Sequence, residues 1–347
     1  GALATSWQLP ADRVAEADLR RERSGEQRAL LFDDAFSVLE RGRPAQAELP
    51  PLREGELVLL YHPLGDGWVG FAADASGVRA RRLGRIDLAA DGAALAAGLL
   101  EPFRDALESP ARLRILAHGA LEEVDFHALP WGSSVLLADR EVIYGLDMPA
   151  LESSGRSRSG VATALVVADP TVTLVGASEL EVPRIGSLLG ESPSWRVETL
   201  EGPTASRLRS RLDGPDLFHF AGHAVLRGRT ESYLQLAERS RLALGEVLTL
   251  PRVPPEVVLS ACRGAGPESG EEGSGLSLAQ AFLLAGSETV VAAVRPVDDV
   301  ATGRLMIGLY EQRLRHPTLA QALRSAQLEA RGQEPEGVWS SFRVLER

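Results

Sequence analysis

The sequence contains no lysine and no asparagine, and it has a single cysteine among its 347 residues. Without lysine, the chain cannot form a P-loop, a Schiff base or a Ser-Lys dyad, and without asparagine it cannot form a papain-type Cys-His-Asn triad. A single thiol excludes an internal disulfide framework and a site of clustered thiolates. The absence of lysine and asparagine suggests a GC-rich bacterial genome. Any sulfur chemistry depends on Cys262 alone.

Long apolar runs and an excess of basic charge are also missing. No run approaches the length of a membrane span, and the first residues lack the charged and apolar parts of a secretory signal. We therefore expect a cytoplasmic protein with no membrane partner. The chain has 48 acidic against 37 basic residues and a net charge of -11, which disfavours nucleic acid as a partner. Apolar residues make up 44% of the chain, enough for a substantial core.

Residues 1–55 form the first region that composition sets apart. They are rich in Ala, Arg, Glu and Leu, which favour helices, and their apolar positions recur at helical spacing. We expect an N-terminal helical segment here, with helices over 11–23 and 26–41. The pattern is already helix-like at the first residues, which suggests that the protein continues upstream.

Residues 56–151 form a second, β-rich region. Short strand-like runs separated by Gly and Asp turns predict an antiparallel meander at its start. A run rich in Ser, Arg and Gly at 152–160 is typical of an exposed linker and marks a domain boundary. After the meander, we expect a helix over 88–107 and strands at 113–117 and 124–130.

The third region, 160–347, alternates strands with helices. Continuously apolar strands interleaved with amphipathic helices predict a mainly parallel sheet that is covered on both faces. In such sheets, functional sites gather at the carboxyl ends of the strands. The expected strands are 164–170, 195–200, 216–222, 256–262 and 289–294, and the expected helices are 179–189, 204–212, 276–285, 300–315 and 318–331.

Two of the expected strands run directly into reactive side chains, His223 and Cys262. An imidazole beside a thiol stabilises the thiolate and can later protonate a leaving amine, so this pair suits a thiol hydrolase. Position alone also allows a structural interpretation, in which the cysteine is a small buried hydrophobe and the histidine a buried hydrogen-bonding group. His219 precedes His223 by four positions, and we expect it to be structural. Such a pair would bind a metal only on a helix, which this apolar segment does not favour.

The segments around these two residues carry a family resemblance. FHFAGHA at 218–224 and VVLSACRGAG at 257–266 closely resemble the two signatures of CHAT domains, which are caspase-like modules related to caspases and separase and often joined to tetratricopeptide repeats. The core SACRG is also similar to the caspase pattern Gln-Ala-Cys-Arg-Gly, with Ser260 in place of Gln. The order of the remaining elements resembles the family as well, so the resemblance covers 57–347.

The resemblance implies an α/β fold: a caspase-like three-layer sandwich with a mainly parallel central sheet, preceded by a smaller β-rich half and N-terminal helices. It also implies a cysteine peptidase that needs no metal and no organic cofactor. His223 matches the family's catalytic histidine, and Cys262 matches its nucleophile. Ala224 departs from the glycine that many members carry after the histidine, but it keeps its backbone N–H. The N–H groups of Ala224 and Cys262 are the natural oxyanion donors.

Asp298 and Asp299 follow the expected strand at 289–294, again at a carboxyl end. One interpretation is helix capping, because Asp accepts hydrogen bonds from unpaired N–H groups at a helix start. The other is that one carboxylate lines the pocket for the substrate residue before the scissile bond and selects arginine there, as the matching segment does in separase. Recognition of aspartate would instead need arginines, and Arg263 and Arg295 keep that alternative open. The acidic loop 266–275 is either a solvated connection or a regulatory flap.

We therefore expect a regulated cysteine endopeptidase that works through a Cys-His dyad and a thioester intermediate. Its partner would be a protein substrate, with a bacterial gasdermin in an antiviral defence or cell-death system as one candidate. A regulatory or tetratricopeptide-repeat protein is a second expected partner. Two alternatives remain: a caspase-like scaffold without activity, and a different thiol hydrolase or acyltransferase with the same dyad.

Overall fold

The computed structural model describes residues 52, 55–64, 67–148, 160–169, 174, 176–225, 232–261, 276–334 and 337–347. The chain divides into two compact units, Gly1–Leu49 and Pro50–Arg347, and every described residue belongs to the second. The two helices expected at the N-terminus, residues 152–159 of the expected linker, and Cys262 all lie outside the described residues.

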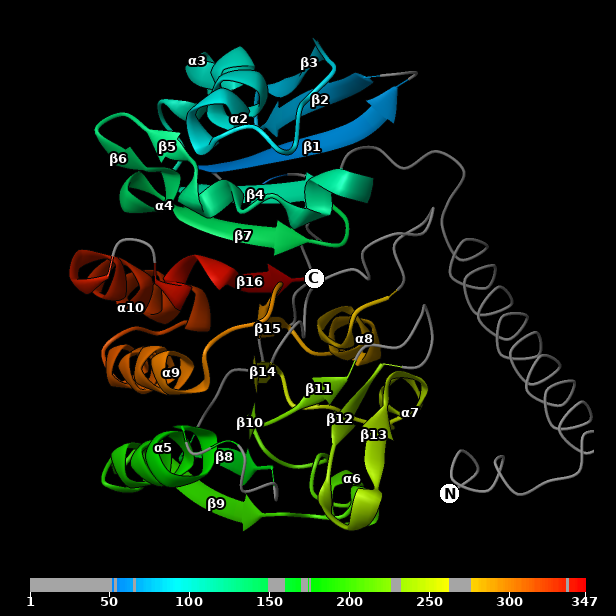
Figure 1. The fold of residues 1–347 in the computed structure, drawn as a ribbon, viewed down its shortest axis with the longest axis vertical. Helices are drawn as coiled ribbons and strands as arrows, with labels where there is room; N and C mark the ends of the chain where they lie inside the picture. The colour runs from blue at the N-terminus through cyan, green and yellow to red at the C-terminus, as the bar shows by residue number, and fades with distance from the viewer. Residues whose placement is uncertain are drawn as a thin grey trace, which may run out of the picture. The chain divides into compact units, whose positions relative to one another are not determined.

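An eleven-stranded sheet runs through the second unit (Figure 1). Its strand order is β3-β2-β1-β4-β7-β16-β15-β14-β10-β8-β9, so strands from both the β-rich region and the third region share one sheet. The strands are β1 Glu56–Leu64, β2 Gly67–Asp74, β3 Gly77–Gly84, β4 Arg112–Ala117, β7 Glu141–Gly145, β8 Ala162–Ala168, β9 Trp195–Glu201, β10 Leu217–Ala221, β14 Glu256–Ser260, β15 Thr289–Ala293 and β16 Phe342–Glu346.

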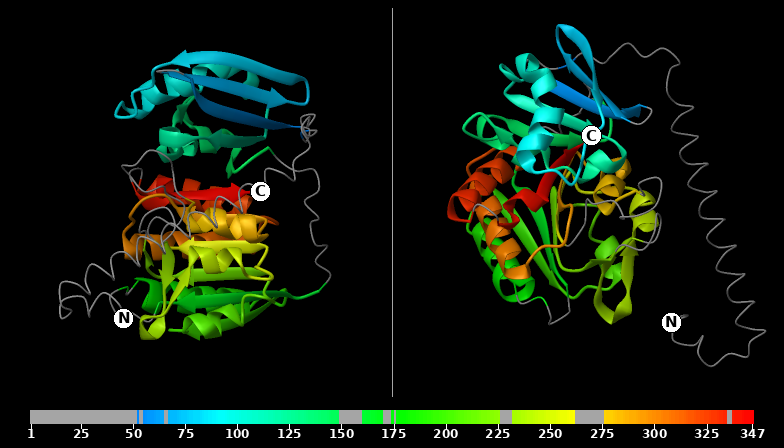
Figure 2. Two further views of the ribbon diagram at one scale, coloured as in Figure 1. Left: turned by 90° about the vertical axis from the view of Figure 1, so that its right-hand side faces the viewer. Right: turned by 45° about the horizontal axis from the view of Figure 1, so that its top comes forward.

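Strand directions divide the sheet into two groups. Strands β9, β8, β10, β14 and β15 are all parallel, so their carboxyl ends share one edge. Strands β1, β4, β7 and β16 are also parallel to one another, but β16 is antiparallel to β15. Strand β16, drawn in red, therefore joins the two groups (Figures 1 and 2). The expected meander is confirmed, because β1, β2 and β3 pair antiparallel in sequence order.

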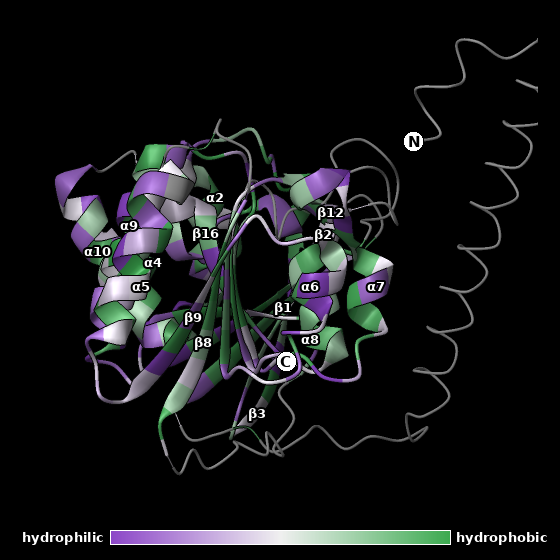
Figure 3. Ribbon diagram, turned by 90° about the horizontal axis from the view of Figure 1, so that it is seen from below, coloured by the Kyte–Doolittle hydropathy of each residue, from purple (hydrophilic) through white to green (hydrophobic). Residues whose placement is uncertain are grey.

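Helices cover both faces of the group formed by β9, β8, β10, β14 and β15, as Figure 3 shows. One layer consists of α5 Val182–Gly190, α9 Asp299–Arg313 and α10 Leu319–Gln333, and the other of α6 Ala205–Arg209, α7 Leu244–Leu248 and α8 Leu278–Ala285. Alternating residues of β10 enter the two layers. Leu217 and Ala221 pack in the core with α5, α9 and α10, whereas Phe218 contacts Phe282 of α8 with ring centroids 6.0 Å apart. The three-layer α/β fold expected from the sequence is thus confirmed.

Further elements complete the fold. Two of them are small β structures, the pair β5–β6 and the three-stranded sheet β11-β12-β13. The short strands are β5 Pro130–Trp131, β6 Ser134–Val135, β11 Ala224–Val225, β12 Tyr233–Gln235 and β13 Arg241–Ala243, and the remaining helices are α2 Gly92–Leu99, η2 Glu101–Phe103, α3 Arg104–Leu107, η3 Gly119–Glu123, η4 Phe126–Ala128, α4 Leu136–Asp139, η5 Gly176–Glu181, η6 Ala237–Arg239 and η7 Val338–Ser341.

Two expected elements differ in the structure. The strand expected at 124–130 is wrong, because this segment contains the 3₁₀ helix η4. Its alternation of apolar residues comes from a turn that buries His127, whose Nδ1 lies 2.8 Å from the hydroxyl of Tyr144. The single helix expected over 88–107 is broken into α2, η2 and α3, since Pro102 has no N–H with which to continue α2.

Candidate active site

Three neighbouring strands end level with one another at the candidate site. Ala221, the last residue of β10, pairs with Ala168 of β8 and with Ser260 of β14. The pairing continues one residue further, because Asp169 donates its N–H to the carbonyl of Ala221 at 2.8 Å and Gly222 donates to the carbonyl of Ser260 at 3.1 Å. Asp169 and His223 are thus brought to the same edge of the sheet.

The backbone of His223 is held from both sides. Its N–H donates to Oδ2 of Asp169 at 2.9 Å, and its carbonyl accepts the N–H of Gln235 at 2.9 Å. The Asp169 side chain is buried and His223 is half-buried, so this hydrogen bond is partly shielded from water. Gly222 allows the close approach, because a Cβ at this position would lie 2.5 Å from the Cβ of Asp169. The half-buried histidine therefore starts from a fixed peptide rather than from a free loop.

The sequence-predicted partners of His223 are described only in part. Cys262 lies outside the described residues, which end at Ala261 in this segment. Ala224 lies opposite Leu234 of β12. The residue before Ala224, His223, accepts the Gln235 N–H at its carbonyl. In an antiparallel ladder this makes Ala224 and Leu234 a non-hydrogen-bonded pair, so the Ala224 N–H does not point toward β12.

His219 is fully buried beneath the site, on the face of β10 that meets α9. Its Nε2 lies 2.9 Å from Oε1 of Glu181, although the carboxylate is off the direction of a good hydrogen bond. The ring of Tyr310 meets His219 edge-on, with centroids 5.3 Å apart. Burial, followed by the charges of Glu181 and Glu256, raises the pKa of the Tyr310 hydroxyl far above its usual value. These contacts agree with the structural interpretation of His219.

Asp298 and Asp299 both accept hydrogen bonds from the backbone. Asp298 is the N-cap of α9, and its Oδ1 accepts the N–H of Ala301 at 2.8 Å. Asp299 uses both carboxylate oxygens at the start of the π-helix η5, with Gly176 N at 2.5 Å from Oδ2 and Ala177 N at 3.1 Å from Oδ1. Capping thus occupies both side chains, but Asp298 is exposed and keeps its Oδ2 outside the cap.

Arg295, which follows β15, is held by an ion pair. Its guanidinium contacts the carboxylate of Asp125 and the hydroxyl of Ser341, the latter at 3.2 Å. Arg343 of β16 donates to the other oxygen of Asp125 at 2.9 Å. The single carboxylate therefore balances two arginines, and the charge of Arg295 is partly neutralised. Arg263, the second arginine considered for aspartate recognition, lies outside the described residues.

Comparison with known proteins identifies the family. The sequence model of the CHAT domain matches residues 89–345. This chain belongs to the CHAT domain family. No curated protein sequence matches it.

Solved structures that resemble this CHAT domain include separase and gingipain R. Separase in the Saccharomyces cerevisiae separase–securin complex has a TM-score of 0.49 and 14% identity, covering 73% of this chain and 17% of separase. The Arg-specific cysteine proteinase gingipain R has a TM-score of 0.51 and 12% identity, covering 73% of this chain and 66% of gingipain. The chain thus spans only about a sixth of the separase chain. The likeness to gingipain R confirms the caspase-like fold.

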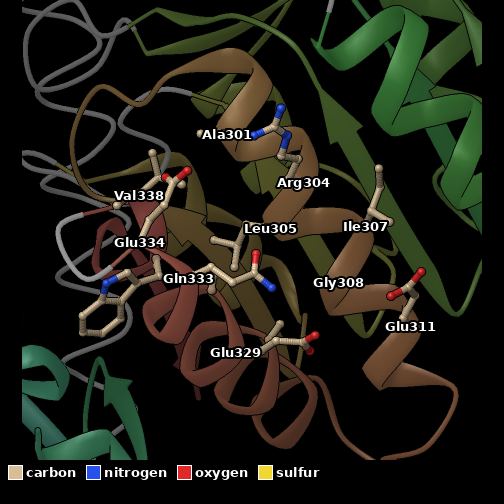
Figure 4. Close-up of a pocket in the computed structure, with 14 residues that line it drawn as sticks. Ala301, Arg304, Leu305, Ile307, Gly308, Glu311, Glu329, Gln333, Glu334 and Val338 are labelled. Carbon is tan, nitrogen blue, oxygen red and sulfur yellow. The ribbon is translucent and has the colours of Figure 1, made fainter. Parts of the chain in front are cut away.

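A separate pocket lies between α9 and α10 of the CHAT domain (Figure 4). Leu305 and Trp339 contribute to its apolar wall, and Arg304, Glu311 and Glu329 are charged residues at its sides. None of the histidines and aspartates described above for the candidate site lines this pocket. Among the described residues, no three His, Cys, Asp or Glu side chains gather as metal ligands, and no helix is long and apolar enough to cross a membrane.

Sequence reasoning missed Asp169 as part of the site. The available signal was an aspartate directly after the apolar strand β8, at the edge where sites are expected. The sequence does not show that its oxygen accepts a backbone N–H from a residue 54 positions away.

Proposed function

We propose that this CHAT domain is a cysteine endopeptidase with His223 as general base and Cys262 as nucleophile. The observation that carries the proposal is the fixed backbone of His223 at the edge where β10 lies beside β14, the strand whose sequence continues into Cys262. Membership of the CHAT family supports the same pairing. A thiol next to a positioned imidazole gains thiolate character and becomes a nucleophile.

The proposed reaction has two halves. His223 accepts the proton of the Cys262 thiol, and the sulfur attacks the scissile carbonyl to give a tetrahedral oxyanion, which the N–H groups of Ala224 and Cys262 stabilise. His223 then gives the proton to the leaving amine, and the peptide bond breaks to leave a thioester. Water, deprotonated by His223, attacks the thioester, and the acid product and the free thiol are released.

Alkylation of the thiol tests the dyad without knowledge of the substrate. Because Cys262 is the only cysteine, iodoacetamide should label a single site. We expect His223→Ala to slow labelling at pH 6.5 by about tenfold or more, since the thiolate loses its partner. His62→Ala, an exposed histidine before the family match, is the matched control and should leave the rate unchanged. Equal rates in all three proteins would contradict the dyad and favour an inactive scaffold.

A dedicated protein substrate is the second part of the proposal. We take a bacterial gasdermin in a cytoplasmic defence system as the first candidate, with a tetratricopeptide-repeat protein as a regulatory partner. The test is to incubate the intact chain and its Cys262→Ala form with proteins encoded beside it. Cleavage by the intact chain alone, abolished also by His223→Ala, supports both activity and substrate. Turnover of small acyl esters without cleavage of any peptide would favour an acyltransferase.

The third part concerns the residue before the cut, for which we propose arginine. Asp298 is the better placed of the two carboxylates to bind a substrate arginine, because both oxygens of Asp299 accept hydrogen bonds from the backbone of η5. Arg295 is engaged by Asp125, which weakens the case for aspartate recognition. A desolvated guanidinium–carboxylate pair is worth roughly 2–5 kcal/mol on truncation of one partner.

Fluorogenic peptides that differ only at this position test the preference. We expect cleavage after Arg, and we expect Asp298→Ala to reduce kcat/KM for Arg peptides while leaving kcat/KM for apolar ones nearly unchanged. Asp299→Ala is the comparison, since it changes a neighbouring carboxylate that is already bonded. Strong cleavage after Asp, unaffected by either substitution, would overturn the proposal.

A further inference from the structure

Strand β3 is a free edge of the sheet. It pairs with β2 on one side, and within the described part of the chain no strand pairs with its other side. Its pairing with β2 is regular from Gly77 to Arg82, and the one register shift lies next to Leu83. In a regular antiparallel strand, every second residue directs its N–H and carbonyl away from the neighbour. Strand β3 therefore presents, over six residues, backbone groups that no strand in the described part of the chain pairs.

This edge is also a local exception to the acidic charge of the chain. Four arginines and no acidic residue occur between positions 75 and 86. Arg79 forms an ion pair with Asp74 of β2. Among the described residues, Arg81 donates only to the carbonyl of Ala80, and Arg82 has no partner. Both side chains are exposed, and because they are consecutive in a strand they point to opposite faces of the sheet.

Charged residues on an edge strand commonly guard it against aggregation, and that role explains part of the pattern. The positive charge of these arginines repels a second copy of the same edge, but it attracts an acidic strand. The edge also lacks the usual structural blocks: β3 contains no proline, and Val78 leaves an apolar side chain 46% exposed. In addition, the strand precedes residue 89, where the CHAT match begins, so the family's chemistry does not account for it.

We propose that β3 is a docking site for an extended acidic segment of a partner protein, which adds to the sheet as a further strand. Backbone hydrogen bonds along Gly77–Arg82 supply the pairing, and Arg81 and Arg82 bind carboxylates on the two faces of the added strand. The fitting segment has neighbouring acidic residues and no proline. The proposal is independent of the peptidase assignment, because binding needs no turnover.

The binding test uses the full chain carrying Cys262→Ala, so that no peptide is cut. The probe is a fluorescein-labelled ten-residue peptide of Glu, Thr and Val with adjacent Glu residues, measured by fluorescence anisotropy. We expect saturable binding, and we expect Arg81→Glu with Arg82→Glu to weaken it by about tenfold or more. The matched control reverses two exposed arginines of loops, Arg211→Glu with Arg252→Glu, whose side chains are 53% and 69% exposed. This control should bind as the parent does.

Hydrogen exchange tests the mode of binding. Strand addition should slow exchange of the β3 amides between Gly77 and Arg82 when the peptide is bound, and a peptide with proline at alternate positions should neither bind nor protect. Four results would overturn the proposal: no saturable binding at millimolar peptide, equal binding of a second peptide in which Lys replaces every Glu, binding without protection of β3, or a single-stranded DNA decamer that binds as tightly through the same arginines. The last result would indicate recognition of charge alone.

Discussion

Asp169 fixes the backbone of His223, because its carboxylate accepts the His223 N–H. Loss of this acceptor frees the peptide that carries His223, the proposed general base, and a displacement of about 1 Å can cost about 100-fold in rate. We expect Asp169→Ala to lower kcat/KM by up to about 100-fold while the far-UV circular dichroism stays unchanged. Asp169→Asn keeps an oxygen acceptor and should retain much more activity. Equal activity of both variants and the parent would show that this hydrogen bond does not position the proposed base.

His127 is a second residue with a measurable consequence. Burial lowers the pKa of its imidazole from the usual 6.5 to about 4, and the side chain is only 2% exposed. The unfolded chain therefore binds a proton that the folded chain does not as the pH falls from 6.5 to about 4. Folding stability is therefore lost as the pH falls across this window. The shift of this one group lowers the free energy of unfolding by up to about 3 kcal/mol.

Substitution of His127 should reduce this acid sensitivity. His127→Gln is neutral at every pH, so its free energy of unfolding should fall less than that of the parent between pH 6.5 and pH 4. The measurement is urea unfolding at several pH values, and the difference between the two curves isolates the histidine from the carboxylates. His62→Gln, at an exposed histidine, is the control and should follow the parent. Parallel curves for His127→Gln and the parent would contradict the depressed pKa.

Helix α9 and the π-helix η5 depend on the two neighbouring aspartates in different ways. Asp298 satisfies one N–H within its own helix, whereas Asp299 satisfies two N–H groups of η5, far away in sequence. The last residue of η5, Glu181, in turn meets His219 of β10. Asp299 therefore supports the strand that leads into the site.

Asp299→Ala should accordingly destabilise the protein more than Asp298→Ala. Loss of a cap costs about 0.5–2 kcal/mol, and Asp299→Ala leaves two N–H groups without their acceptor, so we expect the upper part of that range for it and the lower part for Asp298→Ala. Thermal unfolding followed by circular dichroism measures both. Asp299→Asn, which keeps one oxygen acceptor, should lie between Asp299→Ala and the parent. The opposite order of the two alanine variants would contradict the contact with η5.

The elements that the sequence predicted well are those with a local signal. Strands such as β8, β10 and β14 are continuous apolar runs that end in small or polar residues, and α9 and α10 have Asp and Thr caps that fit their first turns. Strand β16 was missed because Arg343 and Glu346 make it look polar. Their charges are balanced by Asp125 and Arg112, which lie more than 200 positions away in sequence.

The candidate site divides in the same way. His223 follows a strand whose apolar run and motif are visible in the sequence, so its position at a carboxyl edge was predictable. Asp169 was not, because its partner is a backbone N–H, which carries no residue-type signature. The pairing of Asp299 with η5 is another contact of this kind. Contacts between distant backbone and side-chain atoms depend on the folded register of the strands.

The two groups of strands form one sheet through β16. This strand contacts the helices on one face of the sheet and the arginines of β4 at its end. Its side chains Phe342 and Val344 are buried in the core with α9 and α10, and Gln327 of α10 donates to the carbonyl of Phe342 at 2.9 Å. At its end, Glu346 forms ion pairs with Arg112 and Arg114 of β4. These ion pairs are partly buried, and breaking them from one side is costly because the remaining charge, above all that of Arg114, stays in a poorly solvated position.

Removal of the last ten residues should therefore unfold the second unit rather than trim its surface. A chain that ends at Gly337 lacks η7 and β16, so β7 and β15 both lose a neighbouring strand, and Arg112 and Arg114 lose Glu346. We expect no cooperative thermal transition for this chain and little soluble protein. Removal of Arg347 alone, which lies outside β16, is the control and should leave the transition in place. If the shorter chain kept a parent-like transition, the two groups of strands would have to be stable as separate units, and β16 would be an accessory strand instead of the one that joins them.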